Sequence, residues 1–198
     1  ITATDAINAT GAIVLEDNAT VNGTDLLAAG FQQGLGNRTT LSGALTFGGV
    51  STTIGDDGSL AAGTGISATL TGDLLCADRC TISTSTGSVT VIADDFSIGD
   101  DGSWPITTAT LTGSASLGER STITFSGSVG NGLTTDPLST LTLGGLLTTT
   151  GAVTVRGTVV WGTQSWTCLG TSGTVLNFTN AGFTGFPGSP TLRGLLTV

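Results

Sequence analysis

The chain of 198 residues has the length of one ordinary domain, and its 38% apolar content is enough to bury a core. Its formal net charge is −9 and its only cations are five arginines, so it lacks the basic patch that nucleic-acid binding requires. No apolar run approaches the roughly 18 residues of a membrane helix, and we expect no membrane span.

The composition favours many short β-strands. Thr is the commonest residue, 32 residues are Gly, and Lys, Met, Tyr and His are absent. Thr and Val suit pleated, half-buried surfaces, whereas Gly supplies tight turns and is poor in helix interiors. No segment keeps a helical period long enough to predict a helix.

Residues 1–36 precede the regular pattern described below, and we interpret them as a capping or assembly segment. The first residue is Ile and no signal-peptide pattern precedes it, which is the expectation for a mature secreted form. Two roles stay open for the small, apolar stretch 1–15. It could add as a strand to the sheet edge of the next subunit, or it could cap its own domain. The candidate assembly residues are Ile1, Ala3, Ile7, Ile13 and Leu15.

Five of the seven asparagines lie in Asn-x-Thr sequons without an intervening Pro. Chance predicts about two such sequons in a chain of this Ser and Thr content. The excess predicts N-linked glycans, and therefore an extracellular or cell-surface location. The candidate sites are Asn8, Asn18, Asn22, Asn37 and Asn177.

A repeat runs through residues 37–162. Segments that begin at Asn37, Asp78 and Glu119 each place an Arg second and an alternating strand after it, and they lie 41 residues apart. Two Ile-Gly-Asp-Asp-Gly-Ser turns, at 54–59 and 98–103, fall about halfway between them. This interleaving indicates a unit of roughly 20 residues, which is typical of one coil of a β-helix or β-solenoid.

We therefore predict an all-β, single-domain solenoid, with a β-sandwich or jelly roll as the alternative. Residues 163–198 lose the pattern and are interpreted as a C-terminal cap, because solenoids need atypical ends. The predicted strands are 44–50, 65–70, 87–92, 109–114, 122–129, 139–147 and 153–161. The predicted inward side chains are Leu45, Phe47, Leu70, Val89, Val91, Leu111, Ile123, Phe125, Leu141, Leu143, Val153, Val155 and Val159.

Three cysteines, Cys76, Cys80 and Cys168, suggest one disulfide and one remaining thiol in a secreted protein. Cys76 with Cys80 would close a short loop, and Cys168 with either is the alternative. Zinc is disfavoured, because a C-x-x-x-C pair in a chain without His provides too few ligands.

Pairs of neighbouring Asp residues are the remaining candidates for a catalytic or metal-binding site. Neighbouring carboxylates could act as acid and base in a glycosidase, but only if two of them oppose each other across a cleft. Structural calcium is a second hypothesis, although the spacing matches no known calcium loop. The calcium candidates are Asp94, Asp95, Asp100 and Asp101. A solvated turn without metal is the simpler interpretation, and we predict no cofactor.

The sequence lacks the side chains that several other catalytic mechanisms require. The absence of His removes imidazole bases and the Ser-His-Asp triad, and the absence of Lys removes Schiff-base chemistry. We therefore do not expect an enzyme. Arg38, Arg79 and Arg120 are expected to bridge carboxylates or carbonyls of neighbouring coils, and Trp161 is expected to pack in the core or a cap.

The Asp-Gly turns and the Gly- and Thr-rich coils resemble the solenoid repeats of bacterial adhesins and phage tail fibres, over residues 38–160. That resemblance implies an extended surface fibre and transfers no site residues. The leading hypothesis is a self-associating structural subunit of a glycosylated extracellular filament or surface assembly. The alternatives are an adhesin or an ice- or glycan-binding solenoid with stacked Thr-x-Thr faces, and a virion fibre or decoration protein.

Overall fold

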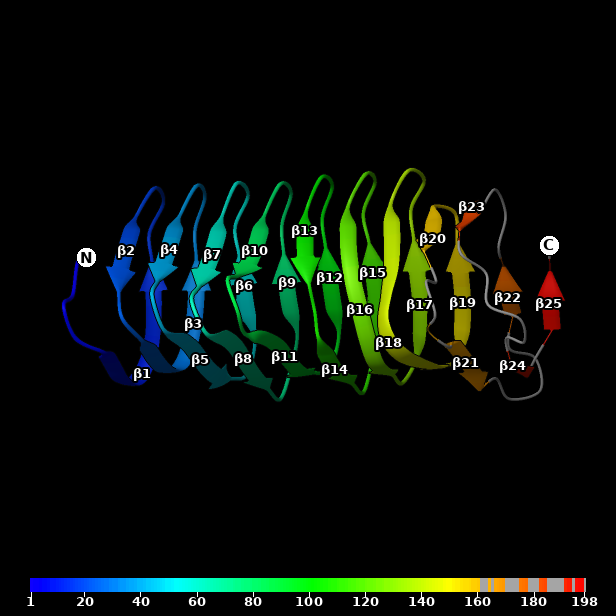
Figure 1. Ribbon diagram of the computed structural model, residues 1–198, viewed down its shortest axis with the longest axis horizontal. Helices are drawn as coiled ribbons and strands as arrows, with labels where there is room; N and C mark the ends of the chain where they lie inside the picture. The colour runs from blue at the N-terminus through cyan, green and yellow to red at the C-terminus, as the bar shows by residue number, and fades with distance from the viewer. Residues whose placement is uncertain are drawn as a thin grey trace.

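The protein is a rod of stacked β coils (Figure 1). The computed structural model describes residues 1–160, 164 and 166–169, together with the backbone of strands at 175–177, 182–184, 191–193 and 195–197. All regular elements in these residues are β-strands, and every strand pairing is parallel. The predicted all-β solenoid is confirmed, and the sandwich alternative is excluded, because a sandwich is built from antiparallel sheets.

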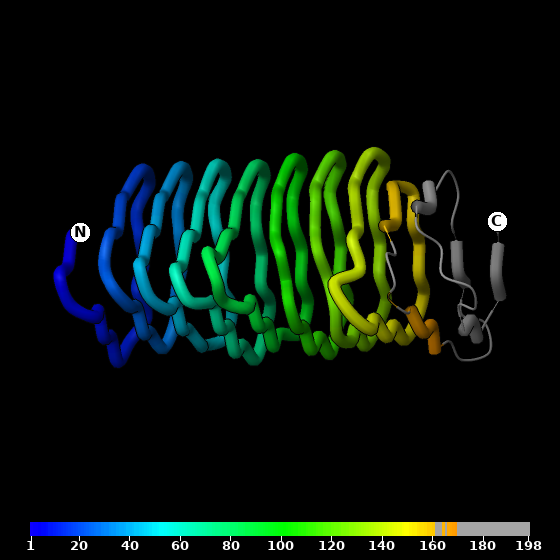
Figure 2. The backbone as a smooth tube through the Cα atoms, viewed as in Figure 1, coloured from blue at the N-terminus to red at the C-terminus, as the bar shows by residue number. Residues whose placement is uncertain are grey.

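Each coil contributes to three parallel ladders that enclose the core (Figures 1 and 2). Four longer strands bend over a corner: β1 (Ile7–Leu15) and β3 (Leu26–Gln33) run from ladder B into ladder C, while β16 (Thr122–Val129) and β18 (Thr140–Thr150) run from ladder A into ladder B.

Ladder A also contains β2 (Thr20–Gly23), β4 (Arg38–Leu41), β7 (Ser59–Ala62), β10 (Thr81–Thr84), β13 (Ser103–Pro105), β20 (Thr158–Val160) and β23 (Gly182–Thr184). Ladder B contains β5 (Ala44–Gly49), β8 (Gly65–Leu70), β11 (Ser88–Ala93), β14 (Thr108–Leu111), β21 (Trp166–Leu169) and β24 (Thr191–Arg193). Ladder C contains β6 (Thr52–Ile54), β9 (Leu74–Cys76), β12 (Phe96–Ile98), β15 (Ser114–Leu117), β17 (Gly132–Thr135), β19 (Ala152–Val155), β22 (Val175–Asn177) and β25 (Leu195–Thr197).

Alternation along each strand builds the core. Successive side chains point to opposite faces of a strand, and parallel registration places like residues above one another. All of the predicted inward side chains are buried. Two ring contacts fix the bulkiest layers, with centroids 5.6 Å apart for Phe31 and Phe47 and 5.1 Å apart for Phe96 and Trp104. Each fully buried side chain of this size contributes roughly 1.5–3 kcal/mol relative to an exposed one.

The predicted coil length is close to the observed one, but the predicted ends are not distinct. Equivalent turn residues recur every 18 to 22 positions from Asn18 to Leu138. Residues 1–36 form coils of the same solenoid, because β1, β2 and β3 lie in the same ladders as the strands after residue 37. The described backbone after residue 163 likewise continues the three ladders.

The predicted strands cover ladder B best and omit most of the short strands of ladders A and C. The segment 153–161 is two strands, β19 and β20, on different ladders. The three-residue strands β6, β9 and β12 were not predicted, because three residues between two turns are too few to establish an alternating pattern. The described residues contain no helix able to cross a membrane.

Candidate functional site

The most regular chemical feature is a row of stacked turns where ladder C passes into ladder A, along the upper edge of Figure 1. We call it the turn row. In seven of these turns the fourth residue has a left-handed backbone, with φ between 56° and 65°, whereas the shorter turn from Val155 to Thr158 has no such residue. Asn and Asp tolerate this conformation better than Arg or Leu, which need support from their surroundings. The seven turns span 15–20, 33–38, 54–59, 76–81, 98–103, 117–122 and 135–140, with fourth residues Asn18, Gly36, Asp57, Arg79, Asp101, Arg120 and Leu138.

Five of the seven left-handed turns have an acidic third residue, and four of these carboxylates bond to the following coil. Asp56 Oδ1 accepts the backbone N–H of Asp78 at 3.2 Å, and Asp78 Oδ1 accepts that of Asp100 at 2.9 Å. Asp100 does the same for Glu119 at 2.8 Å, as Asp17 does for Leu35 at 2.8 Å. These bonds satisfy donors that the ladders leave unpaired at the corner. The contacts assign these carboxylates to turn stabilisation.

Opposite charges alternate along the fourth column of the turn row. Arg79 donates to both oxygens of Asp57, at 2.7 and 2.9 Å, and Arg120 donates to both oxygens of Asp101, at 2.8 Å each. The guanidinium hydrogen bonds lower the pKa of Asp57 and of Asp101, and each carboxylate raises the pKa of its arginine. The predicted bridging role is confirmed for Arg79 and Arg120, whereas Arg38 lies exposed on ladder A.

The two inward positions of each turn, the first and the fifth, meet beneath it. Cys76 and Cys80 occupy them in one turn and form a disulfide, with Cα atoms 6.0 Å apart. The turns on either side hold Ile54 with Gly58 and Ile98 with Gly102 instead. A Cβ on Gly102 would lie 2.4 Å from Ile98 Cγ1, so the isoleucine occupies the space that the disulfide fills elsewhere.

The third cysteine is separate from this pair. Cys168 is free and buried, and burial raises the pKa of its thiol. Its sulfur lies 3.3 Å from Thr149 Oγ1, which also accepts a hydrogen bond from Trp166 Nε1 at 3.0 Å. The disulfide therefore follows the short-loop alternative. Trp161 lies outside the described residues.

The calcium hypothesis does not agree with the structure. Asp94 and Asp95 lie at the corner between ladders B and C, where Asp95 Oδ1 accepts the N–H of Ser114 and Asp94 accepts the hydroxyl of Thr112. Asp100 and Asp101 lie in the turn row, beyond strand β12. Across the described part of the chain, no group of three or more acidic, Cys or His side chains is arranged to hold a metal ion.

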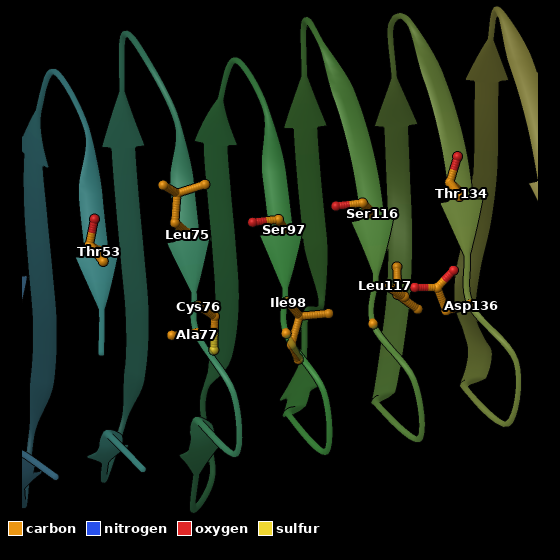
Figure 3. Close-up of a pocket in the computed structure, with 12 residues that line it drawn as sticks. Thr53, Leu75, Cys76, Ala77, Ser97, Ile98, Ser116, Leu117, Thr134 and Asp136 are labelled. Carbon is orange, nitrogen blue, oxygen red and sulfur yellow. The ribbon is translucent and has the colours of Figure 1, made fainter. Parts of the chain in front are cut away.

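A shallow groove of about 470 Å³ runs along ladder C beside the turn row (Figure 3). Small residues such as Ala77, Gly99 and Gly118 line it, and Asp136 lies among the lining residues. A Cβ at Gly99 would lie 2.4 Å from Asp78 Oδ1 and 2.8 Å from the carbonyl carbon of Ala77, so a larger residue there would crowd the preceding turn. The groove contains no opposed pair of carboxylates of the kind that glycosidases use.

The outward side of ladder A consists mainly of small polar residues, and we call it the hydroxyl face. Thr122 and Thr124 stack directly on Thr140 and Thr142. Thr110 lies on ladder B, where it pairs with Ser128, so the predicted stack of three Thr-x-Thr segments is reduced to two. The outward columns are Thr20, Arg38, Ser59, Thr81, Ser103, Thr122, Thr140 and Thr158, and Asn22, Thr40, Ala61, Ser83, Pro105, Thr124, Thr142 and Val160.

The segment 1–15 lies on its own solenoid. The amino group of Ile1 donates to Thr20 O at 2.7 Å, Ala3 N donates to Asn22 O at 2.9 Å, and β1 pairs with β3 along most of its length. Leu15 is buried, while Ile7 and Ile13 are only partly buried against the core. Of the two predicted roles, the structure shows the segment as the first coil of its own domain.

Four of the sequons fall within described side chains. Asn8, Asn18 and Asn22 are exposed, whereas Asn37 is fully buried. Asn37 lies in the fifth position of its turn, beneath the backbone, and has no room for a glycan in the folded chain. We therefore remove it from the candidate sites. Asn177 lies in β22, where only the backbone is described.

Comparison of the chain with protein-family models, with curated proteins and with solved structures finds no match.

Proposed function

We propose that this chain is a structural subunit of an extracellular filament or surface assembly, built by head-to-tail stacking of solenoids. The supporting observation is the open side of the first coil. Among the described residues, β1 has a neighbouring strand on one side only. Ile7, Ala9 and Ile13, which point toward the core, are left partly exposed on the other side.

An open strand edge above half-covered apolar side chains favours pairing with another chain. The cross-section of a solenoid is the same at each coil, so a second copy can continue all three ladders in parallel. Such a contact joins two different surfaces and does not close on itself, and it therefore produces a filament. This replaces donation of a free strand, since β1 is already paired within its own chain.

Two observations support an extracellular location. The Cys76–Cys80 disulfide is typical of oxidising compartments. The outer columns of ladder A consist almost entirely of small uncharged residues, and Arg38 is their only charged member. Surface hydroxyls keep such a rod hydrated at low charge.

The decisive experiment is electron microscopy of purified native material, followed by two substitutions in the assembling chain. Ile13→Lys places a charge toward the core of the open edge and is expected to abolish filaments. Val14→Lys is the matched control, because Val14 is 59% exposed and points outward from the same strand. Thermal melts establish that both variants fold. Native material without filaments, or filaments that persist in folded Ile13→Lys, would overturn the proposal.

The hydroxyl face supports a second candidate function, namely binding to an ordered lattice such as ice. Its specific support is the direct stacking of Thr122 and Thr124 on Thr140 and Thr142. Arg38 and Pro105 interrupt the same columns, which makes this candidate the weaker one. An ice-recrystallisation assay separates the two, because a filament subunit is expected to be inactive. Loss of a measured activity in Thr124→Leu with Thr142→Leu would establish the second candidate.

A further inference from the structure

The first two coils contain four sequons of the same type whose surroundings differ sharply. In three of them, the asparagine is exposed and the threonine is exposed or partly exposed. These pairs are Asn8 with Thr10, Asn18 with Thr20, and Asn22 with Thr24. In the fourth, Asn37 is 0% and Thr39 is 1% exposed. The chain thus carries its own internal control for glycan attachment.

The side chain of Asn37 makes two buried hydrogen bonds that a glycan would disturb. Its Nδ2 donates to Leu15 O at 2.8 Å, and its Oδ1 accepts the N–H of Ala19 at 2.5 Å. Thr39 is engaged as well, because its hydroxyl accepts from Gln33 Nε2 at 2.8 Å. A sugar on this fully buried Nδ2 would have no space and would force open the stacked turns. A chain modified there could not form this fold.

The three exposed asparagines lie on different sides of the rod. Asn8 belongs to the ladder B part of β1, where it pairs with Leu27 and alternates with the inward Ile7. Asn18 is the left-handed residue of the first turn in the turn row. Asn22 lies on the hydroxyl face, where it pairs with Thr40. Together they surround one end of the described solenoid.

We propose that Asn8, Asn18 and Asn22 carry N-linked glycans that form a collar around the first coils, while Asn37 is unmodified. The amide Nδ2 of each asparagine forms a bond to the anomeric carbon of a lipid-diphosphate-linked oligosaccharide. The bond from that carbon to the diphosphate oxygen breaks, the lipid diphosphate leaves with the electron pair, and the amide loses one proton. The transfer involves no oxidation or reduction.

The collar deepens the proposed function, and it rests on the extracellular location proposed there. Asn8 and Asn22 point outward from their ladders, and Asn18 lies on the exposed turn row. Glycans at these positions project sideways and leave the open edge of β1 free for axial stacking. They would instead keep neighbouring filaments apart at this level of each subunit.

Glycopeptide mass spectrometry of the native protein tests the collar. Cleavage after Arg38 releases one peptide that contains all four asparagines, and cleavage at Glu16 and Asp25 then separates Asn8, Asn18 with Asn22, and Asn37. Fragmentation assigns the sites within the middle peptide. The expected result is a glycan on Asn8, Asn18 and Asn22 and an unmodified Asn37. A glycan on Asn37, or the absence of glycan from any of the other three, would overturn the proposal.

Secretion from a glycosylating host provides the matched variants. Thr10→Ala, Thr20→Ala and Thr24→Ala each remove one sequon without altering its asparagine, and each is expected to lower the intact mass by one glycan. A mass that is unchanged in any of the three overturns the collar at that position. Filaments without glycans would contradict only the glycan collar, whereas glycosylated monomers would contradict only the proposed filament.

Discussion

Two neighbouring turns of the turn row bury side chains of opposite polarity at their inward first and fifth positions. The turn at 33–38 buries Gln33 and Asn37 at its inward positions, whereas the turn at 54–59 buries Ile54 with Gly58. The polar turn satisfies Asn37 fully, but Gln33 Oε1 has no hydrogen-bond partner. The apolar turn avoids that cost by filling the space with one branched side chain. The comparison shows that equivalent inward positions of the turn row accept either a polar or an apolar pair.

The largest effect is expected from breaking the polar turn. Asn37→Ala removes two buried side-chain hydrogen bonds and leaves a cavity, although Ala19 N still donates to Glu16 O and Leu15 O still accepts from Gly34 N. The two lost bonds and the cavity together are expected to cost about 3 kcal/mol of unfolding free energy. Urea denaturation of the purified variant measures the loss. Asn22→Ala, on the exposed surface, is the control and should change stability by less than about 0.5 kcal/mol. Equal stability of Asn37→Ala and the parent would contradict the assignment.

The disulfide turn provides the next test, because its two neighbours show how to replace it. Cys76→Ala with Cys80→Ala removes both the cross-link and the sulfur volume, and is expected to cost roughly 2–4 kcal/mol. Cys76→Ile with Cys80→Gly copies the pairs at 54/58 and 98/102 and should recover a large part of that loss. Thermal melts of the two double variants make the comparison. If the Ile/Gly variant is no more stable than the Ala/Ala variant, then the turns are not equivalent.

The smallest effect is expected from the alternating charges, which are about half exposed. Hydrogen bonds from Arg79 and Arg120 lower the pKa of Asp57 and Asp101 in the folded protein. A lowered folded-state pKa stabilises the fold above the unfolded value of about 3.9, and this contribution disappears as the pH falls through the folded-state pKa. Asp57→Asn with Asp101→Asn should therefore flatten the decline in melting temperature below pH 4. An unchanged acid profile would show that the ion pairs contribute nothing to stability.

The sequence predicts the fold class and the core well, because both follow from period-two alternation and from the repeat of about 20 residues. Leu45, Ile123 and Val155 needed only this pattern to be placed in the core. Short strands such as Phe96–Ile98 were not predicted, since three residues carry too little periodicity. The coils within residues 1–36 were not recognised as repeats, because this segment contains one Glu and no Arg and so lacks the marker that revealed the later turns.

The candidate site was predicted less completely, because the sequence does not show which neighbours a turn residue meets. Pairing of Arg79 and Arg120 with carboxylates was expected, but their specific partners depend on coil lengths of 22 and 19 residues. The buried state of Asn37 was not predicted either. Its sequon is identical in form to the exposed ones, and only its position beneath a turn distinguishes it.

The carboxylates of the turn row give the rod a direction. Asp17, Asp56, Asp78 and Asp100 each accept an N–H from the coil that comes later in the chain. The backbone bonds at the same corner run the other way, because Asp57 N and Arg79 N donate to the carbonyls of Asp78 and Asp100 in the following coil. A coil inserted in the reverse direction could not reproduce both sets of bonds, so the stack is polar from one end to the other.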